Sequence, residues 1–166
     1  MSSLAILILT KNEEDNIVDV VENAKQCTPE VLVIDSGSTD KTVELAQAHG
    51  ARVCFRAWTD DFAAQRNFAL EQTTADWVLY LDADERLNDE LIHSVKAVVD
   101  EGKLDCQFSM ERKSVAFGTK FNHGVLKPDH VTRMFPRTTV TWVHKVHEHP
   151  ECDLPLRSLP GHIEHY

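Results

Sequence analysis

The stretch that decides the fold is Trp77-Val78-Leu79-Tyr80-Leu81-Asp82-Ala83-Asp84-Glu85. An apolar run typical of a buried strand ends in two carboxylates, Asp82 and Asp84. Residues two apart on a strand point the same way, so both side chains can project from its carboxyl end, where ligands bind in open α/β sheets. Two hard oxygen ligands suit Mg²⁺ or Mn²⁺, and such a metal can hold a diphosphate. A plain polar loop after a buried strand is the other interpretation of a bare D-x-D.

Strand-like and helix-like segments alternate around this stretch. Apolar runs predict strands at residues 4–9, 30–35, 52–55 and 77–81. Apolar periodicity and capping residues predict helices at about residues 15–27, 41–49, 60–73 and 89–100. Repeated alternation implies a parallel sheet with right-handed crossovers. We therefore predict an α/β fold, with a Rossmann-like, mostly parallel sheet and helices on both faces.

The pattern changes beyond Lys103. Short β-type runs at residues 106–110, 131–135 and 140–143 alternate with Gly, Pro and His, without a long helix. This favours a smaller antiparallel or mixed C-terminal extension of the same domain. With 166 residues, the chain is expected to be a single domain 1–166, in which residues 1–102 form one half and residues 103–166 the other.

Composition limits the function and the compartment. The formal net charge of −10 disfavours a general nucleic-acid-binding role. The four cysteines form no C-x-x-C pair and are interpreted as reduced thiols. The start of the chain has no basic segment, and its apolar run is too short for a signal peptide or a membrane span. We expect a cytoplasmic protein.

Three more polar clusters follow predicted strands or lie in predicted helices: residues 10–14 (TKNEE), 35–40 (DSGSTD) and 65–67 (QRN). Each alone has an ordinary explanation, as a helix N-terminus, a turn and the solvent face of a helix. The chain lacks both G-x-G-x-x-G and G-x-x-x-x-G-K-[ST], which argues against NAD binding and P-loop chemistry.

Taken together and in this order, TKNEE, DSGSTDKT, QRN and DADE resemble the family 2 glycosyltransferases of the GT-A fold. The similarity is to the short bacterial type that adds glucose or a related sugar to the lipopolysaccharide core. The C-terminal part is similar to that group as well: Gly124, Pro128-Asp129, and residues 133–135 (RMF), 142–148 (WVHKVHE) and 161–166 (GHIEHY). The resemblance covers essentially the whole chain.

The resemblance implies a site for a nucleotide-sugar donor, which in this group is expected to be a UDP-sugar. Its nucleotide-binding positions correspond to Thr10, Asn12, Glu13, Asp35, Ser38, Arg66 and Asp82. Its metal-binding positions, for Mn²⁺ or Mg²⁺, correspond to Asp84 and Asp82, and His147 is the histidine expected to join them. The metal would neutralise charge on the departing nucleoside diphosphate.

The family inverts the anomeric configuration, so one carboxylate that accepts the proton of the acceptor hydroxyl is enough. Glu148 is the residue we expect in this role, and Asp129 is the second candidate. A structural salt bridge from Glu148 to Arg133 is the competing interpretation. The acceptor implied by the resemblance is a glycan or glycolipid.

The C-terminal part is rich in histidine, with seven of the nine histidines at or after His123. We expect one or two of His147, His162 and His165 to approach the diphosphate or the D-x-D metal. The set Arg112, Lys113, Lys120 and Lys127 is either a solvated face or a groove for an anionic acceptor.

Similar enzymes continue past the His-Tyr position with helices associated with the inner membrane face, whereas this sequence stops at Tyr166. The expectations are therefore a truncated or a minimal form, with peripheral membrane contact and oligomeric state left open. The alternative function is a degenerate nucleotide- or sugar-binding domain without transfer. A sugar nucleotidyltransferase is disfavoured because TKNEE replaces a Gly-rich loop, and a phosphatase because the carboxylate pair follows the fourth strand rather than the first.

Overall fold

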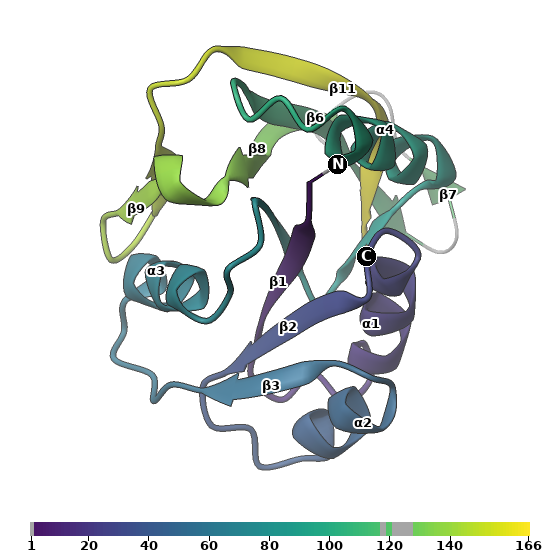
Figure 1. Cartoon of the computed structure of the whole chain (residues 1–166). Helices are drawn as coiled ribbons and strands as arrows, with labels where there is room; N and C mark the ends of the chain where they lie inside the picture. The colour runs from purple at the N-terminus through teal and green to yellow at the C-terminus, as the bar shows by residue number, and fades with distance from the viewer. Residues whose placement is uncertain (1, 117–118, 121–127) are drawn as a thin grey trace.

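The computed structural model describes residues 2–116, 119–120 and 128–166, and these form a mixed sheet with helices on both faces (Figure 1). In the described ranges the sheet has nine strands in the order β3-β2-β1-β4-β8-β6-β11-β5, and β7 pairs with β6. The helices are α1 (Ile17–Lys25), α2 (Thr42–Ala48), α3 (Phe62–Glu71) and α4 (Asp89–Glu101). The predicted α/β fold with a mostly parallel sheet is confirmed.

The first half of the sheet is parallel and buried. Its strands are β1 (Leu4–Thr10), β2 (Glu30–Asp35), β3 (Arg52–Phe55) and β4 (Trp77–Asp82), and all neighbours among them pair in parallel. Side chains alternate between two cores, as expected of a strand covered on both faces. Leu4, Ile6 and Ile8 pack with α1, α2 and α4, whereas Ala5 and Leu7 pack with α3.

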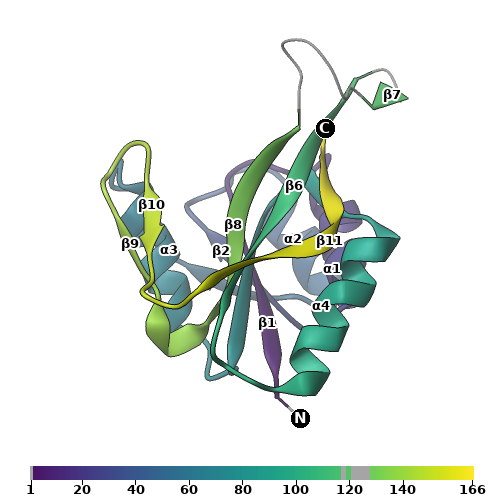
Figure 2. The same ribbon diagram turned by 90° about the horizontal axis from the view of Figure 1, so that it is seen from above.

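The second half extends this sheet beyond β4, mostly through antiparallel pairs. Its strands are β5 (Glu85–Leu87), β6 (Gln107–Ala116), β7 (Thr119–Lys120), β8 (Asp129–Pro136) and β11 (Leu156–His165). Only the β6–β11 pair is parallel within this group. A separate hairpin of β9 (Thr141–Val143) and β10 (His149–Glu151) lies beside α3 (Figure 2). The predicted antiparallel or mixed extension is thus confirmed, while the division near residue 102 stays a prediction.

The structure differs from the sequence prediction in two places. Helix α1 begins at Ile17 instead of directly after Glu14, because residues 13–16 form a turn in which the Glu13 carbonyl accepts bonds from Asn16 and Ile17. Strands β5 and β11 were not predicted. Strand β5 is short and polar, and β11 contains Pro160 and Gly161 at a register shift between Ser158 and His162.

The ends of α4 agree with the sequence signals. Asn88 accepts a bond from Leu91 N–H at 3.0 Å as the N-cap, and Gly102 ends the helix in the left-handed conformation. Helix α4 has 13 residues, and no helix within the described ranges is both long and apolar enough to cross a membrane.

Candidate active site at the carboxyl ends of the parallel strands

The loops after β1 and β2 are joined by the carboxylate of Asp35. This side chain is buried and accepts four hydrogen bonds, from the hydroxyls of Thr10 and Ser38 and from the backbone N–H groups of Gly37 and Ser38. The structure thus uses Asp35 to shape the edge of the site. Its predicted contact with a nucleotide stays a prediction.

Asn12 and Glu13 are held against the loop after β2. Asn12 has a positive φ of 52°. Its backbone N–H donates to Ser38 Oγ at 2.8 Å, and its side-chain oxygen accepts from Thr39 N–H at 2.8 Å. Glu13 N–H donates to Thr42 Oγ1, and its carboxylate faces the site, where it accepts a bond from Asn16. The predicted nucleotide-binding residues of these two loops therefore lie together at one end of the sheet.

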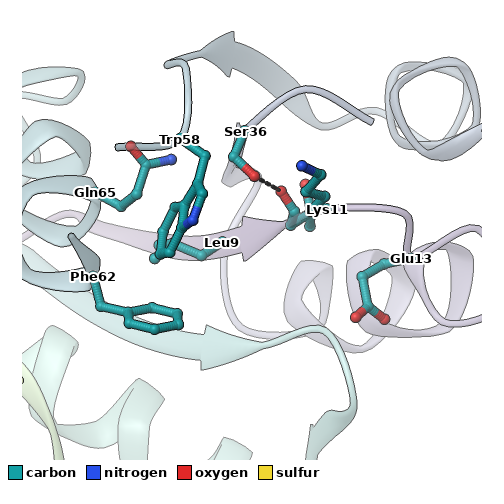
Figure 3. Close-up of a pocket in the computed structure, with 8 residues that line it drawn as sticks. Leu9, Lys11, Glu13, Ser36, Trp58, Phe62 and Gln65 are labelled. Carbon is teal, nitrogen blue, oxygen red and sulfur yellow. Dashed lines mark hydrogen bonds between the residues drawn. The ribbon is translucent and has the colours of Figure 1, made fainter. Parts of the chain in front are cut away.

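A cavity of about 320 Å³ opens beside these loops (Figure 3). It is lined by Leu9, Thr10, Lys11, Glu13, Ser36, Trp58, Phe62 and Gln65. Trp58 and Phe62 form an aromatic wall, with ring centroids 4.7 Å apart in an edge-to-face arrangement. The opposite side is polar. Sequence reasoning missed both aromatics, because single aromatic residues after a short strand carry no distinctive signal.

A second cavity, also about 320 Å³, contains the acidic groups. It is lined by Leu9, Glu13, Phe62, Arg66, Asp82, Ala83, Asp84 and Glu148. Leu9, Glu13 and Phe62 line both cavities, so the aromatic and acidic cavities adjoin as one cleft. The D-x-D carboxylates are partly accessible, with side-chain exposures of 36% for Asp82 and 41% for Asp84. A small ligand in the cleft can reach them.

The turn that carries Asp82 and Asp84 is built around the buried side chain of Glu85. Glu85 accepts bonds from the Asp82 N–H at 2.8 Å, from Arg133 at 2.6 and 3.1 Å, and from Arg112 at 3.2 Å. Burial alone raises the pKa of Glu85, but the charge of Arg133 and these hydrogen bonds outweigh it and lower the pKa to about 2. Sequence reasoning gave Glu85 no role, because its partners come from distant strands.

Arg66 pairs with two carboxylates that line the acidic cavity, those of Asp82 and Glu148. Its Nη2 is 3.5 Å from Asp82 and 3.8 Å from Glu148. The guanidinium is buried over the ring of Trp142, at 4.7 Å from the centroid, and near that of Tyr80, at 5.5 Å. Arg66 is therefore part of the cavity wall and not of a solvent-facing helix surface.

The two candidates for the base occupy different places. Glu148 lines the acidic cavity and pairs with Arg66. Asp129 lies at the start of β8, pairs with Arg112 at 2.9 Å, and does not line either cavity. The competing salt bridge is not formed between these described residues, since Arg133 pairs with Glu85 and Asp82 instead of Glu148.

The histidine that contacts the D-x-D pair is His165, whose Nε2 is 3.1 Å from Asp84 Oδ2. His162 instead pairs with the side chain of Asn88. His147 is exposed, with a φ of 56°, and within the described part of the chain no three His, Cys, Asp or Glu side chains come together as a metal site. The role of His147 as a metal ligand stays a prediction. His123, Gly124, Lys127 and the side chain of Lys120 lie outside the described residues.

Comparison with known proteins decides the family. Residues 5–146 match the sequence profile of glycosyl transferase family 2. The chain belongs to this family. One relative of this family 2 chain is an uncharacterized glycosyltransferase of Rickettsia typhi. The two are 39% identical over a region that covers 59% of this chain and 33% of the relative. The lipopolysaccharide core biosynthesis glycosyltransferase LpsC of Rhizobium meliloti is 36% identical over 59% of the chain and 38% of its own length.

Solved structures agree with this family 2 assignment. The S. aureus TarS fragment in complex with UDP has a TM-score of 0.60 and 25% identity, over 74% of this chain and 38% of its own. GalNAc-T7 with UDP, GalNAc and Mn²⁺ has a TM-score of 0.70 over 99% of this chain and 44% of its own, with 11% identity, and shows the fold alone. The chain spans about a third of the length of the curated relatives it matches.

Proposed function

We propose that this family 2 chain is the sugar-donor-binding and catalytic unit of an inverting, metal-dependent glycosyltransferase. The observation that carries the proposal is the cleft in which an aromatic-walled cavity adjoins an acidic one. The first offers faces on which a nucleoside base can stack, and the second gathers carboxylates beside Arg66. UDP is the nucleotide to expect, as in the complex with TarS.

The residues of the acidic cavity fit a divalent cation. Asp82 and Asp84 are oxygen ligands of the type that Mg²⁺ and Mn²⁺ prefer, and both are accessible from the cavity. When bound, the metal supplies positive charge that stabilises the nucleoside diphosphate as it leaves. The fold accommodates UDP together with Mn²⁺ in GalNAc-T7.

The remaining chemistry falls to side chains of this chain. Glu148 is the proposed base, because it is the candidate carboxylate that lines the same cavity as the D-x-D pair. Arg66 holds both Asp82 and Glu148, and its Nε–H has no hydrogen-bond partner among the described residues. A buried unpaired donor is costly, and the oxygen of an anionic ligand would satisfy it.

The finer assignment is transfer of glucose to a hydroxyl of the lipopolysaccharide core or another cell-envelope glycan, at the cytoplasmic face of the inner membrane. It is supported by the motif resemblance and by the relative LpsC. Selectivity between sugar epimers depends on a few hydrogen bonds, so the sugar must be determined by a donor screen.

The decisive experiment is calorimetric titration of UDP, GDP and CDP with Mn²⁺ or with EDTA, followed by measurement of UDP release from UDP-glucose. We expect UDP to bind only with Mn²⁺, and Asp84→Ala to weaken this binding at least tenfold. Asp100→Ala, at an exposed position on α4, is the matched control.

Two results would argue against the proposal. Equal UDP affinity in Asp84→Ala and the parent chain would remove the metal site from the D-x-D pair. UDP binding without any hydrolysis or transfer across a panel of UDP-sugars would favour the alternative, a binding domain.

A further inference from the structure

Two asparagines on different helices form the same contact with two different strands. Asn67 on α3 donates its amide to the Trp142 carbonyl at 2.9 Å and accepts from the Trp142 N–H at 2.8 Å. Asn23 on α1 donates to the Leu87 carbonyl at 2.9 Å and accepts from the Leu87 N–H at 2.8 Å. In each case one side-chain amide forms hydrogen bonds with both the backbone N–H and the backbone carbonyl of a single strand residue, as a neighbouring strand would.

The strand held by Asn67 leads directly to the proposed base. Trp142 lies on β9, and Val143 pairs with His149 to close a hairpin loop at residues 144–148, which carries Glu148. His144 and His147 in this loop both have positive φ, of 72° and 56°, a conformation that non-glycine residues adopt at a cost. The loop therefore depends on external contacts for its shape.

Those contacts come from α3. Besides the Asn67 bonds, the Phe62 N–H at the start of α3 donates to the Lys145 carbonyl at 3.1 Å. The Trp142 ring lies under the guanidinium of Arg66, which Tyr80 and Asp82 hold as well. Helix α3 thus holds the hairpin that carries Glu148 (Figure 2).

The strand held by Asn23 follows the D-x-D turn. Leu87 is the last residue of β5, which begins at Glu85 directly after Asp84. One edge of β5 pairs with β11, in the register Leu87 to Ile163, and Asn23 occupies the opposite edge. The strand is short, so this amide adds a second anchor, after the Glu85 side chain, that fixes the position of the turn.

We infer that Asn67 and Asn23 are separate positioning residues for the two halves of the cleft. Asn67 places the Glu148 loop, and Asn23 places the Asp82–Asp84 turn. The inference rests on the proposed function for its catalytic consequence. Only an amide donates and accepts at once at these sites, so Asn→Asp keeps the shape and the accepted bond but puts an oxygen against the strand carbonyl.

The test compares Asn67→Asp and Asn23→Asp in the full chain, with Mn²⁺, UDP and UDP-glucose as probes. Asn67→Asp is expected to lower kcat for UDP release at least tenfold while the Kd for UDP stays within threefold. Asn23→Asp is expected to raise the Kd for UDP at least tenfold. Asn88→Asp is the control, because its oxygen keeps the bonds from the Leu91 and His162 N–H groups, and the His162 ring nitrogen that faces its amide can donate to a carboxylate in the other tautomer. Both parameters should stay within twofold.

A merely structural role would not separate the two parameters. Equal losses of kcat and UDP affinity in both variants, or no change in either, would overturn the inference. If an Asn→Asp variant fails to fold, Asn67→Ser and Asn23→Ser are measured instead, and they must show the same separation in weaker form.

Amide hydrogen exchange of the unliganded protein tests the two contacts even if the chain proves not to bind UDP, which would contradict the proposed function alone. Asn67→Asp should speed exchange at residues 142–148 at least tenfold without affecting residues 82–87, and Asn23→Asp should do the reverse. A uniform change across both segments, or none, would contradict the separate roles.

Discussion

At the scale of single residues, the two candidate bases sit at opposite ends of one series of ion pairs. The series runs from Asp129 through Arg112, Glu85, Arg133, Asp82 and Arg66 to Glu148. Both ends are carboxylates paired with an arginine, so residue type and pairing do not separate them. Position does, because only Glu148 of these two lines the cleft.

Glu148→Gln is therefore expected to lower kcat for sugar transfer at least about 100-fold, the usual contribution of a general base. The amide keeps the shape of the side chain but does not accept the proton, so the Kd for UDP should stay within about threefold. Glu151→Gln, at an exposed position on β10 of the same hairpin, is the control. Unchanged turnover in Glu148→Gln with loss in Asp129→Asn would reverse the assignment.

The buried carboxylate of Glu85 leads to a prediction about the free energy of unfolding and its dependence on pH. Its folded-state pKa is lowered from 4.5 to about 2, against burial and by the charge of Arg133. Because the folded pKa lies below the unfolded one, the carboxylate stabilises the fold fully above about pH 4.5, and this contribution is lost as the pH falls toward about 2.

Glu85→Gln should accordingly lower the free energy of unfolding by about 3–5 kcal/mol at pH 7, because it leaves Arg133 and Arg112 without their buried partner. In urea unfolding the difference from the parent should shrink at pH 3. Glu101→Gln removes an exposed pair with Lys103 and should change stability by less than about 0.5 kcal/mol. A pH-independent difference would contradict the assigned pKa.

At the scale of elements, the contact between α4 and β11 depends on a glycine. Gly161 has a φ of +97°, and a Cβ there would be 2.3 Å from the backbone nitrogen of Leu91 at the start of α4. The same junction is tied by the Asn88 N–H bond to the His162 carbonyl. The register shift in β11 thus lets the strand pass close to the helix.

Gly161→Ala is expected to destabilise the fold by about 3 kcal/mol or more, since positive φ and steric overlap act together. Gly50→Ala is the matched comparison, because Gly50 also has positive φ but its Cβ would meet only the flexible end of Lys25, at 3.1 Å. That change should cost about 1 kcal/mol. If urea unfolding shows the same loss of stability for both variants, the backbone shifts enough to remove the overlap between the new Cβ and Leu91.

At the scale of the whole molecule, the cleft joins the two halves of the chain. Asp82 and Asp84 follow a strand of the parallel half, whereas Glu148 comes from the hairpin after β8. A ligand that bridges them binds the folded state only. Its binding should therefore stabilise the entire domain.

UDP at about 100 times its Kd, with Mn²⁺, should add about 2.7 kcal/mol to the free energy of unfolding. For a chain of this size that corresponds to a rise in Tm of about 5–10 °C. Thermal unfolding with UDP and EDTA, or with Mn²⁺ alone, is the control and should show little of this shift. A similar rise with Mn²⁺ alone would mean that the metal binds independently of the nucleotide.

The sequence by itself determined the parallel strands, the helices between them and the acidic turn after Leu81. These features depend on local patterns: continuous apolar runs, helical periodicity and capping residues such as Asn88. The sequence also indicated the family, because its motifs occur in a recognisable order. The sequence places the start of α1 directly after Glu14, slightly before Ile17, since the tertiary bonds of Asn12 and Glu13 to the loop after β2 hold residues 13–16 as a turn.

Only the tertiary structure decided which side chains meet. The burial of Glu85 between Arg112 and Arg133 depends on the register of β6, β8 and β5, which no local pattern encodes. The contact of Asn67 with β9 likewise joins segments far apart in the chain, and the first cavity brings Trp58 and Phe62 together with the loops after β1 and β2. Periodicity specifies whether each segment forms a helix or a strand. Packing across the sheet specifies which side chains of distant segments come into contact, and the candidate site is built from such contacts.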